Sequence, residues 1–232
     1  MALVTLLEIE REVRLLSAGE RELLLAWING QLETDSRVSE PPMGYGAAAP
    51  ERRLFTFEEY LDIERSGPLR HEYVAGEIFA MGEPRQAHAI IAMNLAAALH
   101  AHLSGRPCRT YAGDRRLHFK RRGADIAYYP DAWVGCSETR NTKGELDDEP
   151  RLVIEILSPS TERIDRREKA INYREIASLQ EIVLVAQKPA SIILYRRADR
   201  WSPITLDSAE DLLELASVGF ALSVGRIYTG VP

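Results

Sequence analysis

The sequence predicts a mixed α/β domain that follows a short helical extension. Runs rich in Val, Ile, Leu and Tyr, which favour strands, recur through the second half of the chain and alternate with segments of helical periodicity. The first residues instead carry apolar side chains at helical spacing. We therefore divide the 232 residues into a helical hairpin at 1–34, a linker at 35–50 and a domain at 51–232.

Composition limits the class of protein. A chain that is 45% hydrophobic and 28% charged can bury a sizeable core. The net charge of -6 argues against a surface that is basic throughout, but allows a local basic patch. Cys108 and Cys136 make neither a disulfide framework nor a zinc set, and Glu8 and Glu10 replace the basic and apolar residues of a signal peptide. No apolar run reaches transmembrane length, so we expect a reduced, soluble, cytoplasmic protein.

The N-terminal segment is expected to form an αα-hairpin. Ser17 and Glu20 have the spacing of a capping box between its two helices. Its apolar stripes comprise Leu6, Ile9, Val13, Leu16, Leu23, Leu24, Trp27 and Leu32. A hairpin this small cannot bury its stripes alone, so we expect it to pack on the domain, on a second copy or on a partner protein. The linker is DSRVSEPPMGYGAAAP, which is rich in Pro, Gly, Ala and Ser.

Two helices and a hairpin are expected at the start of the domain. Thr56 and Glu59 have capping-box spacing and begin a helix that ends before Gly67-Pro68. Ala75-Gly76 joins the strands 70–74 and 77–81, because glycine supplies the positive φ that a tight turn needs. The Ala- and Leu-rich segment from Gln86 to about Leu103 predicts a core helix.

The rest of the domain is expected to be mainly β. Two strands are joined by the basic turn Lys120-Arg121-Arg122-Gly123, which is expected to be a solvated hairpin tip. An acidic loop and a buried strand follow. A helix begins near Asp165, and the last segment, 212–228, packs back on the sheet. The predicted ranges are strands at 110–122, 125–135, 151–157, 181–186, 191–197 and 201–206, and a helix at 165–178.

Glu155 lies in the middle of the apolar run RLVIEILSPST, which spans 151–161. Such a run predicts a buried strand, where an ionised side chain requires a cation, a metal or strong donors. Two interpretations follow. Glu155 is either a structural carboxylate, on the wet face of an edge strand or in an ion pair, or a metal ligand.

Asp131 and Lys169 complete a possible site with Glu155. Pro130 favours an edge or a bulge, which re-aims the Asp131 side chain. Carboxylates on adjacent strands repel each other unless a divalent cation neutralises them, and Mg²⁺ prefers oxygen ligands. Lys169 lies about one turn into its helix, where its ammonium points back toward the preceding strand. Each residue also has an ordinary structural interpretation. Asp131 would be a turn or bulge residue, Glu155 would pair with an arginine, and Lys169 would be a solvated helix residue.

The ordered motifs of the domain resemble those of the large bacterial Uma-two family, which is assigned to the PD-(D/E)XK restriction-endonuclease-like superfamily. The resemblance covers roughly 54–231 and excludes the N-terminal hairpin. It implies a mixed central sheet flanked by helices. The motifs are HEYVAGEIFAM, His88 in a following helix, YPDAWV, PRLVIEILSPST, D-x-x-x-K with Tyr173, and SLQEIVLVAQ.

The resemblance implies roles for individual residues. Asp131 and Glu155 match the two acids and hold Mg²⁺, for which Mn²⁺ substitutes. The superfamily pattern has lysine two residues after the second acid, where this chain has Leu157. The resemblance therefore implies that Lys169, on the following helix, takes the place of that lysine. Glu72 is preferred narrowly over Glu77 as an auxiliary metal ligand. His88, Asp165 and Tyr173 are supporting residues, and Asp165 is also explained as a helix cap.

The sequence is consistent with three functions. The first is a Mg²⁺-dependent endonuclease that hydrolyses phosphodiester bonds in DNA through Asp131, Glu155 and Lys169. The second is a non-catalytic nucleic-acid-binding or regulatory module, and the third is a protein-interaction role for the N-terminal hairpin. A homodimer would suit double-strand cleavage. The candidate nucleic-acid contacts are Lys120, Arg121, Arg122, Arg166 and Arg167.

Overall fold

The computed structural model describes residues 53–82, 85–113, 115–136, 149–157 and 168–232. All of these residues except Arg53 belong to a unit that spans Leu54–Pro232. The predicted hairpin at 1–34, the linker at 35–50 and most of the acidic loop lie outside the described residues.

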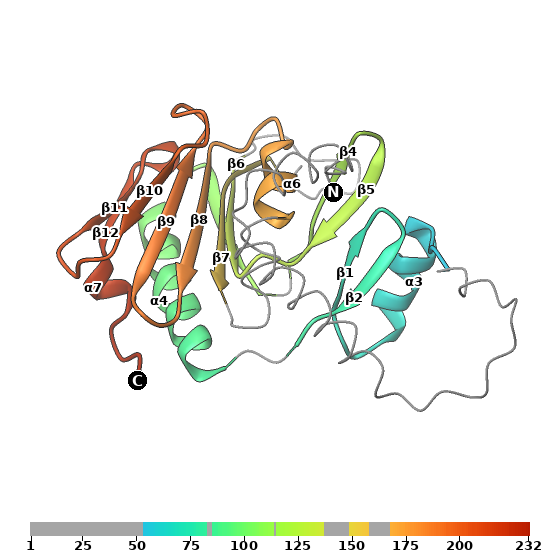
Figure 1. Cartoon of the computed structure of the whole chain (residues 1–232), viewed down its shortest axis with the longest axis horizontal. Coiled ribbons are helices and arrows are strands. Elements are labelled where there is room, and N and C mark those ends of the chain that lie inside the picture. The colour runs from blue at the N-terminus through green and yellow to red at the C-terminus, as the bar shows by residue number, and fades with distance from the viewer. Residues whose placement is uncertain (1–52, 83–84, 114, 137–148, 158–167) are drawn as a thin grey trace, which may run out of the picture. The chain divides into compact units, whose positions relative to one another are not determined.

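A six-stranded mixed sheet forms the centre of the unit (Figure 1). Only β7 and β8 pair in parallel, and the other neighbours in this sheet are antiparallel. The β7 strand therefore lies among paired strands on both sides, as its apolar sequence predicts. In spatial order the strands are β10 (Pro203–Leu206), β9 (Ser191–Arg196), β8 (Glu181–Ala186), β7 (Pro150–Leu157), β6 (Ala132–Cys136) and β3 (Cys108–Ala112).

A second, four-stranded antiparallel sheet carries two tight hairpins. Its spatial order is β2 (Glu77–Ala80), β1 (His71–Val74), β5 (Ala124–Tyr128) and β4 (Leu117–Arg121). The predicted turn at Ala75-Gly76 is confirmed, with φ of 50° and 102°. The β4–β5 turn repeats this geometry, with φ of 49° at Arg122 and 85° at Gly123, because a two-residue hairpin turn of this kind needs positive φ at both positions.

The helices match the sequence expectation at the start of the domain. Helix α3 (Phe57–Ser66) begins with the predicted capping box, in which Thr56 and Glu59 each accept the other's backbone N–H. Helix α4 spans Gln86–Leu103, the predicted range. The C-terminal segment forms β11 (Leu212–Leu215), a short 3₁₀ helix at Ala216–Val218, β12 (Phe220–Ser223) and α7 (Val224–Ile227).

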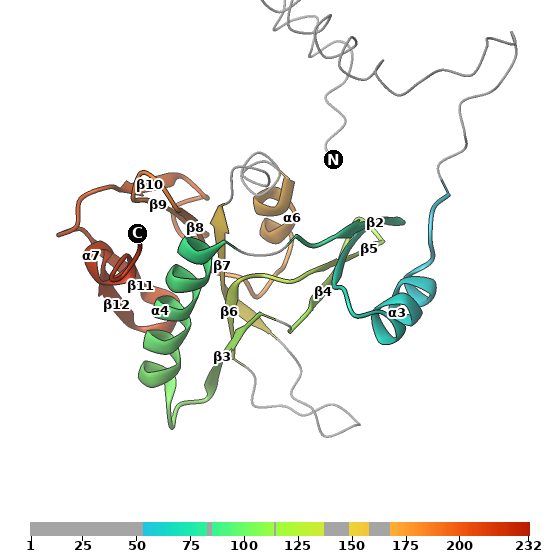
Figure 2. The ribbon, with the colours of Figure 1, turned by 90° about the horizontal axis from the view of Figure 1, so that it is seen from below.

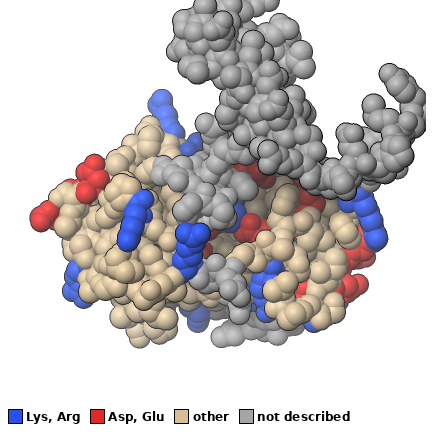
Figure 3. Space-filling view, turned by 60° about the horizontal axis from the view of Figure 1, so that its bottom comes forward, with Lys and Arg blue, Asp and Glu red and all other residues tan. Residues whose placement is uncertain are grey.

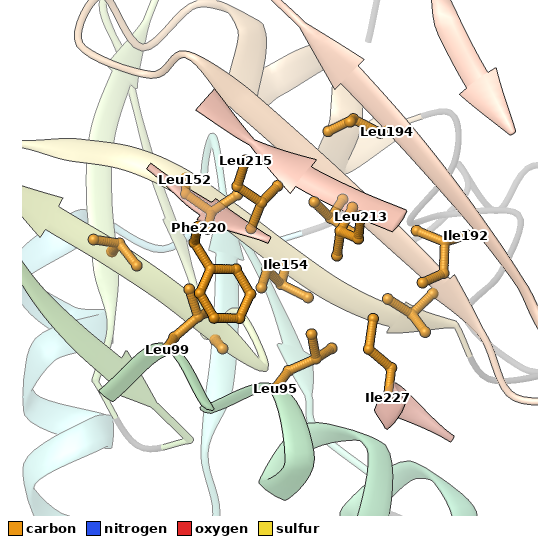
Figure 4. Close-up of a cluster of buried hydrophobic side chains, with 14 of the residues drawn as sticks. Leu95, Leu99, Leu152, Ile154, Ile192, Leu194, Leu213, Leu215, Phe220 and Ile227 are labelled. Carbon is orange, nitrogen blue, oxygen red and sulfur yellow. The ribbon is translucent and has the colours of Figure 1, made fainter. Parts of the chain in front are cut away.

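Apolar side chains fill both faces of the six-stranded sheet. On one face, Leu152 and Ile154 pack with Leu95 and Leu99 of α4 and with the β11–β12 hairpin (Figure 4). On the other face, Val153 and Leu157 pack with side chains of α6 (Ala170–Arg174) and of the four-stranded sheet. Figure 2 shows α4 and α6 on opposite sides of β7. Glu155 shares its side of the strand with Val153 and Leu157, because side chains alternate along a strand.

Two predicted strands are wrong in extent. Each of the ranges 110–122 and 125–135 is broken, and its two halves join different sheets. The second break falls at Tyr129 and Pro130, where proline supplies no N–H for a ladder hydrogen bond. Asp131 therefore follows a strand break directly, at the point where the chain passes from the small sheet to the large one.

The predicted helix at 165–178 is shorter in the structure. Glu168 and Lys169 form a π-helical turn, and α6 ends at Arg174. The start of the predicted helix, including Asp165, lies outside the described residues. Isolated π-helical turns are rare and frequently occur at functional sites.

The expectation of reduced cysteines is wrong for this structure. Cys108 lies opposite Cys136 in the antiparallel pairing of β3 with β6, and their sulfur atoms are bonded. The β3–β6 register brings the two cysteines together. The sequence could not predict the bond, because a separation of 28 residues does not show that the two strands are neighbours. In the part of the chain that the structure describes, no helix combines the length and apolar character needed to cross a bilayer.

Candidate active site

Glu155 is a buried carboxylate in the central strand. Only 3% of its surface is exposed, and it lies among apolar neighbours in β7. The hydroxyl of Tyr173, on α6, donates a hydrogen bond of 2.6 Å to Glu155 Oε1. The structure therefore excludes a wet edge strand for Glu155, since β7 is paired on both sides.

Asp131 directly precedes β6 and binds the backbone of β7 next to Glu155. The β6–β7 pairing ends at Ala132 and Ile154, one residue before Asp131. The backbone N–H of Ile156 donates to Asp131 Oδ2 at 2.6 Å. On its other side, Nε2 of His88 in α4 lies 3.0 Å from Asp131 Oδ1. The strand break at Pro130 thus turns the carboxylate toward a fixed backbone donor.

Lys169 connects Glu155 with Glu72. Its Nζ lies 2.7 Å from Glu72 Oε1 and 3.6 Å from Glu155 Oε1, with only 10% of the side chain exposed. The ammonium also lies 5.3 Å from the centre of the Tyr128 ring, within the range of a cation–π contact. Glu72 is on β1, and its Oε1 accepts the N–H of Tyr129 at 3.4 Å. The two sheets and α6 therefore meet at one group of charged side chains.

Burial and negative charge set the protonation of the site's tyrosine. Burial raises the pKa of Tyr173 well above its ordinary value, and the neighbouring carboxylates of Glu155 and Glu72 raise it further. The phenol therefore stays neutral and keeps its proton for the bond to Glu155.

This donor set fits Mg²⁺. Mg²⁺ commonly takes one or two protein carboxylates and fills its other positions with water and substrate phosphate oxygens. Glu155, and Asp131 bound to the N–H of the residue after it, are two carboxylates of the kind that Mg²⁺ takes. Among the described residues no three or more His, Cys, Asp and Glu side chains are gathered into a preformed cage. The other ring nitrogen of His88, Nδ1, is buried and has no hydrogen-bond partner in the described part of the chain.

The family model Uma2, described as "Putative restriction endonuclease", matches residues 57–225. The chain belongs to this family. A relative, "Uncharacterized protein slr1290" of Synechocystis, is 34% identical over 175 residues, which cover 75% of this chain and 91% of the relative. A second Synechocystis protein, "sll1609", is 28% identical over 137 residues, which cover 58% and 76%.

The fold of the Uma2 domain agrees with a solved structure. A crystal structure from Anabaena variabilis, titled a putative nuclease belonging to DUF820, superposes with a TM-score of 0.56 and 20% identity. The match covers 73% of this chain and 97% of that one. At this identity the likeness shows the fold, which is the predicted mixed sheet flanked by helices.

The remaining predicted site residues are dispersed. Glu77 lies at the turn end of β2, opposite Val74, whereas Glu72 reaches Lys169. Lys120 and Arg122 are exposed at the β4–β5 tip, and Lys120 Nζ lies 3.6 Å from Asp125. Figure 3 shows basic and acidic side chains interspersed over the face in view. Asp165, Arg166 and Arg167 lie outside the described residues.

Arg121 corrects the prediction of a solvated basic turn. It is only 8% exposed, and it points inward and donates to Asn172 on α6 at 2.6 Å. Strand alternation explains this, because the neighbouring Lys120 and Arg122 are exposed. Sequence reasoning also missed Tyr128 and Asn172. A signal for Asn172 was present, since it and Tyr173 follow Lys169 at helical spacing.

Proposed function

We propose that this Uma2 protein is a Mg²⁺-dependent endonuclease that hydrolyses phosphodiester bonds in DNA. One observation carries the proposal. Glu155, buried in the central strand, lies 3.6 Å from the ammonium of Lys169, and the carboxylate of Asp131 accepts the N–H of the next residue of that strand, Ile156. Two acids and a lysine brought together in this way by two strands and a helix are the groups that metal-assisted phosphodiester hydrolysis requires.

Asp131 and Glu155 are the residues that would hold the cation. When bound, Mg²⁺ supplies a Lewis acid and lowers the pKa of a coordinated water. Asp131 is oriented for this role by the Ile156 N–H and by His88, and Glu155 by the Tyr173 hydroxyl. Such supporting bonds keep ligand carboxylates in one orientation and commonly affect metal affinity 10- to 100-fold, as an order of magnitude.

Lys169 is the cation that this chain contributes to the reaction. Its ammonium can donate to a non-bridging phosphate oxygen or orient a water for attack. Glu72 holds it at 2.7 Å, so the lysine is kept at the site before substrate arrives. We assign Glu72 to orienting Lys169, with an auxiliary role as metal ligand when the lysine moves to substrate.

DNA is the proposed substrate because the family model is described as a restriction endonuclease. The net charge of -6 means that attraction to phosphates has to come from local groups. Lys120 and Arg122, exposed at the β4–β5 tip, are the proposed backbone contacts among the described residues. They would contribute affinity and not sequence recognition.

A non-catalytic nucleic-acid-binding module is the second candidate. The close contact of Lys169 with Glu72 favours it, because an ammonium held between two carboxylates stabilises the site without a metal. In that case Asp131, Glu155 and Lys169 would be a structural charge cluster that the fold retains.

Plasmid nicking separates the two candidates. Purified full-length protein is incubated with supercoiled plasmid in Mg²⁺, Mn²⁺ or EDTA, with Glu155→Gln and Asp131→Asn as test variants. We expect relaxation of the plasmid with either cation and none in EDTA or with either variant. Glu181→Gln is the matched control, because Glu181 is equally buried at 2% exposed but pairs with Arg196 at the far end of β8. Equal nicking by wild type and both test variants would exclude the proposed site.

A further inference from the structure

Three buried polar side chains lead from the tip of the β4–β5 hairpin to Lys169. Arg121 Nη1 donates to Asn172 Oδ1 at 2.6 Å, and Asn172 Nδ2 donates to the hydroxyl oxygen of Tyr128 at 2.6 Å. Arg121, Asn172 and Tyr128 are 8%, 0% and 2% exposed. These two hydrogen bonds join β4, α6 and β5.

The direction of these bonds follows from their chemistry. A guanidinium has only donors, so the oxygen of the Asn172 amide must face Arg121. The amide nitrogen then faces Tyr128, whose oxygen accepts. The amide therefore cannot flip without breaking both bonds, and it fixes the rotation of the helical segment that carries it.

Lys169 is linked to this chain of contacts in two ways. Asn172 follows Lys169 by three residues, so locking Asn172 locks the π-helical turn in which Lys169 lies. The ring of Tyr128 also contacts the ammonium, at 5.3 Å from its centre. The next residue, Tyr129, donates its N–H to Glu72, the carboxylate 2.7 Å from Lys169.

A purely architectural role does not require these residue types. A buried arginine has a large desolvation penalty, and an apolar side chain often fills such a position with equal or greater stability. Arg121 also leaves its Nε without an acceptor among the described residues. The desolvation penalty of Arg121 is explained if its guanidinium has to hold the Asn172 amide in one orientation.

We infer that Arg121, Asn172 and Tyr128 are positioning residues that hold Lys169 against Glu72 and Glu155. The inference rests on the proposed function for the role of Lys169 in cleavage. Because the exposed Lys120 and Arg122 flank Arg121 at the same tip, the network also connects the proposed backbone contacts with the lysine.

Lysine-selective labelling tests the network without depending on activity. The chain has four lysines, Lys120, Lys143, Lys169 and Lys188, so protein labelled with ¹³C,¹⁵N-lysine gives few side-chain signals. The Lys169 signal is assigned by its loss in Lys169→Arg. The test variants are Arg121→Met and Tyr128→Phe, and the latter keeps the ring and removes only the acceptor oxygen. Arg122→Gln changes an exposed arginine of the same turn and is the control.

We expect the Lys169 Cε and Nζ signals to shift in both test variants and to stay in place in Arg122→Gln. In the nicking assay, Arg121→Met should lower kcat by roughly 10- to 100-fold, the usual effect of losing a supporting residue, with KM within about twofold of wild type. An unchanged Lys169 signal in both test variants would overturn the inference. If Arg121→Met does not fold, Tyr128→Phe alone decides. If the Lys169 signal shifts but wild type does not nick DNA with any divalent cation, the proposed function fails and the positioning network stands.

Discussion

Lys169→Met tests how strongly the site depends on its ammonium. The substitution keeps most of the side-chain volume and leaves the carboxylates of Glu72 and Glu155 without the cation that now lies 2.7 Å and 3.6 Å from them. Removing one partner of a buried ion pair costs about 3–5 kcal/mol, because a buried charge loses its compensation. For a domain of this size, each kcal/mol lowers Tm by roughly 2–4 °C, so we expect Tm to fall by roughly 6–20 °C in EDTA.

Thermal unfolding followed by circular dichroism, in EDTA and then in Mg²⁺, measures the effect. Saturating Mg²⁺ should stabilise Lys169→Met more than wild type, because the cation replaces a missing positive charge; a cation at 100 times its Kd contributes about 2.7 kcal/mol. Lys120→Met is the control. The Lys120 side chain, which forms an ion pair with Asp125, is 65% exposed. Surface pairs of this kind contribute at most about 1 kcal/mol. Equal Tm values for the two variants in EDTA would refute this account of Lys169.

Two further predictions concern stability outside the site. Burial raises the pKa of Tyr60 above its ordinary value of 10.0, and its phenol therefore binds a proton more tightly in the folded state than in the unfolded one. The contribution of Tyr60 to the free energy of unfolding should be constant up to about pH 9 and be lost as pH rises above about 10, so the free energy should fall less steeply at high pH in Tyr60→Phe than in wild type; equal slopes in urea titrations would contradict this. Reducing the Cys108–Cys136 bond, which closes a loop of 28 residues, should lower the free energy of unfolding by about 3–4 kcal/mol, and unchanged urea midpoints with and without dithiothreitol would contradict the pairing.

Local sequence patterns predicted the elements that depend on local contacts. The capping box at Thr56 and Glu59, the turn at Ala75-Gly76 and the range of α4 need only neighbouring residues, and all three are confirmed. The buried strand around Glu155 was also predictable, because a continuous apolar run cannot be half solvated.

Features that depend on strand pairing were not predictable in this way. The β3–β6 register brings Cys108 opposite Cys136, and no spacing rule indicates that register. Arg121 was expected at a solvated turn, but its position in β4 directs it toward Asn172. The contact between Lys169 and Glu72 joins residues almost 100 positions apart, on elements that meet only in the folded chain.

The central claim is that Asp131 and Glu155 hold a divalent cation. Crystals of wild type and of Glu155→Gln soaked in Mn²⁺, with anomalous difference maps collected above the manganese edge, test it most directly. We expect a peak in wild type that contacts carboxylate oxygens of both Asp131 and Glu155, and a lost or weakened peak in the variant. A wild-type map without a peak at these two carboxylates, from crystals in which Lys169 still contacts Glu72, would contradict it.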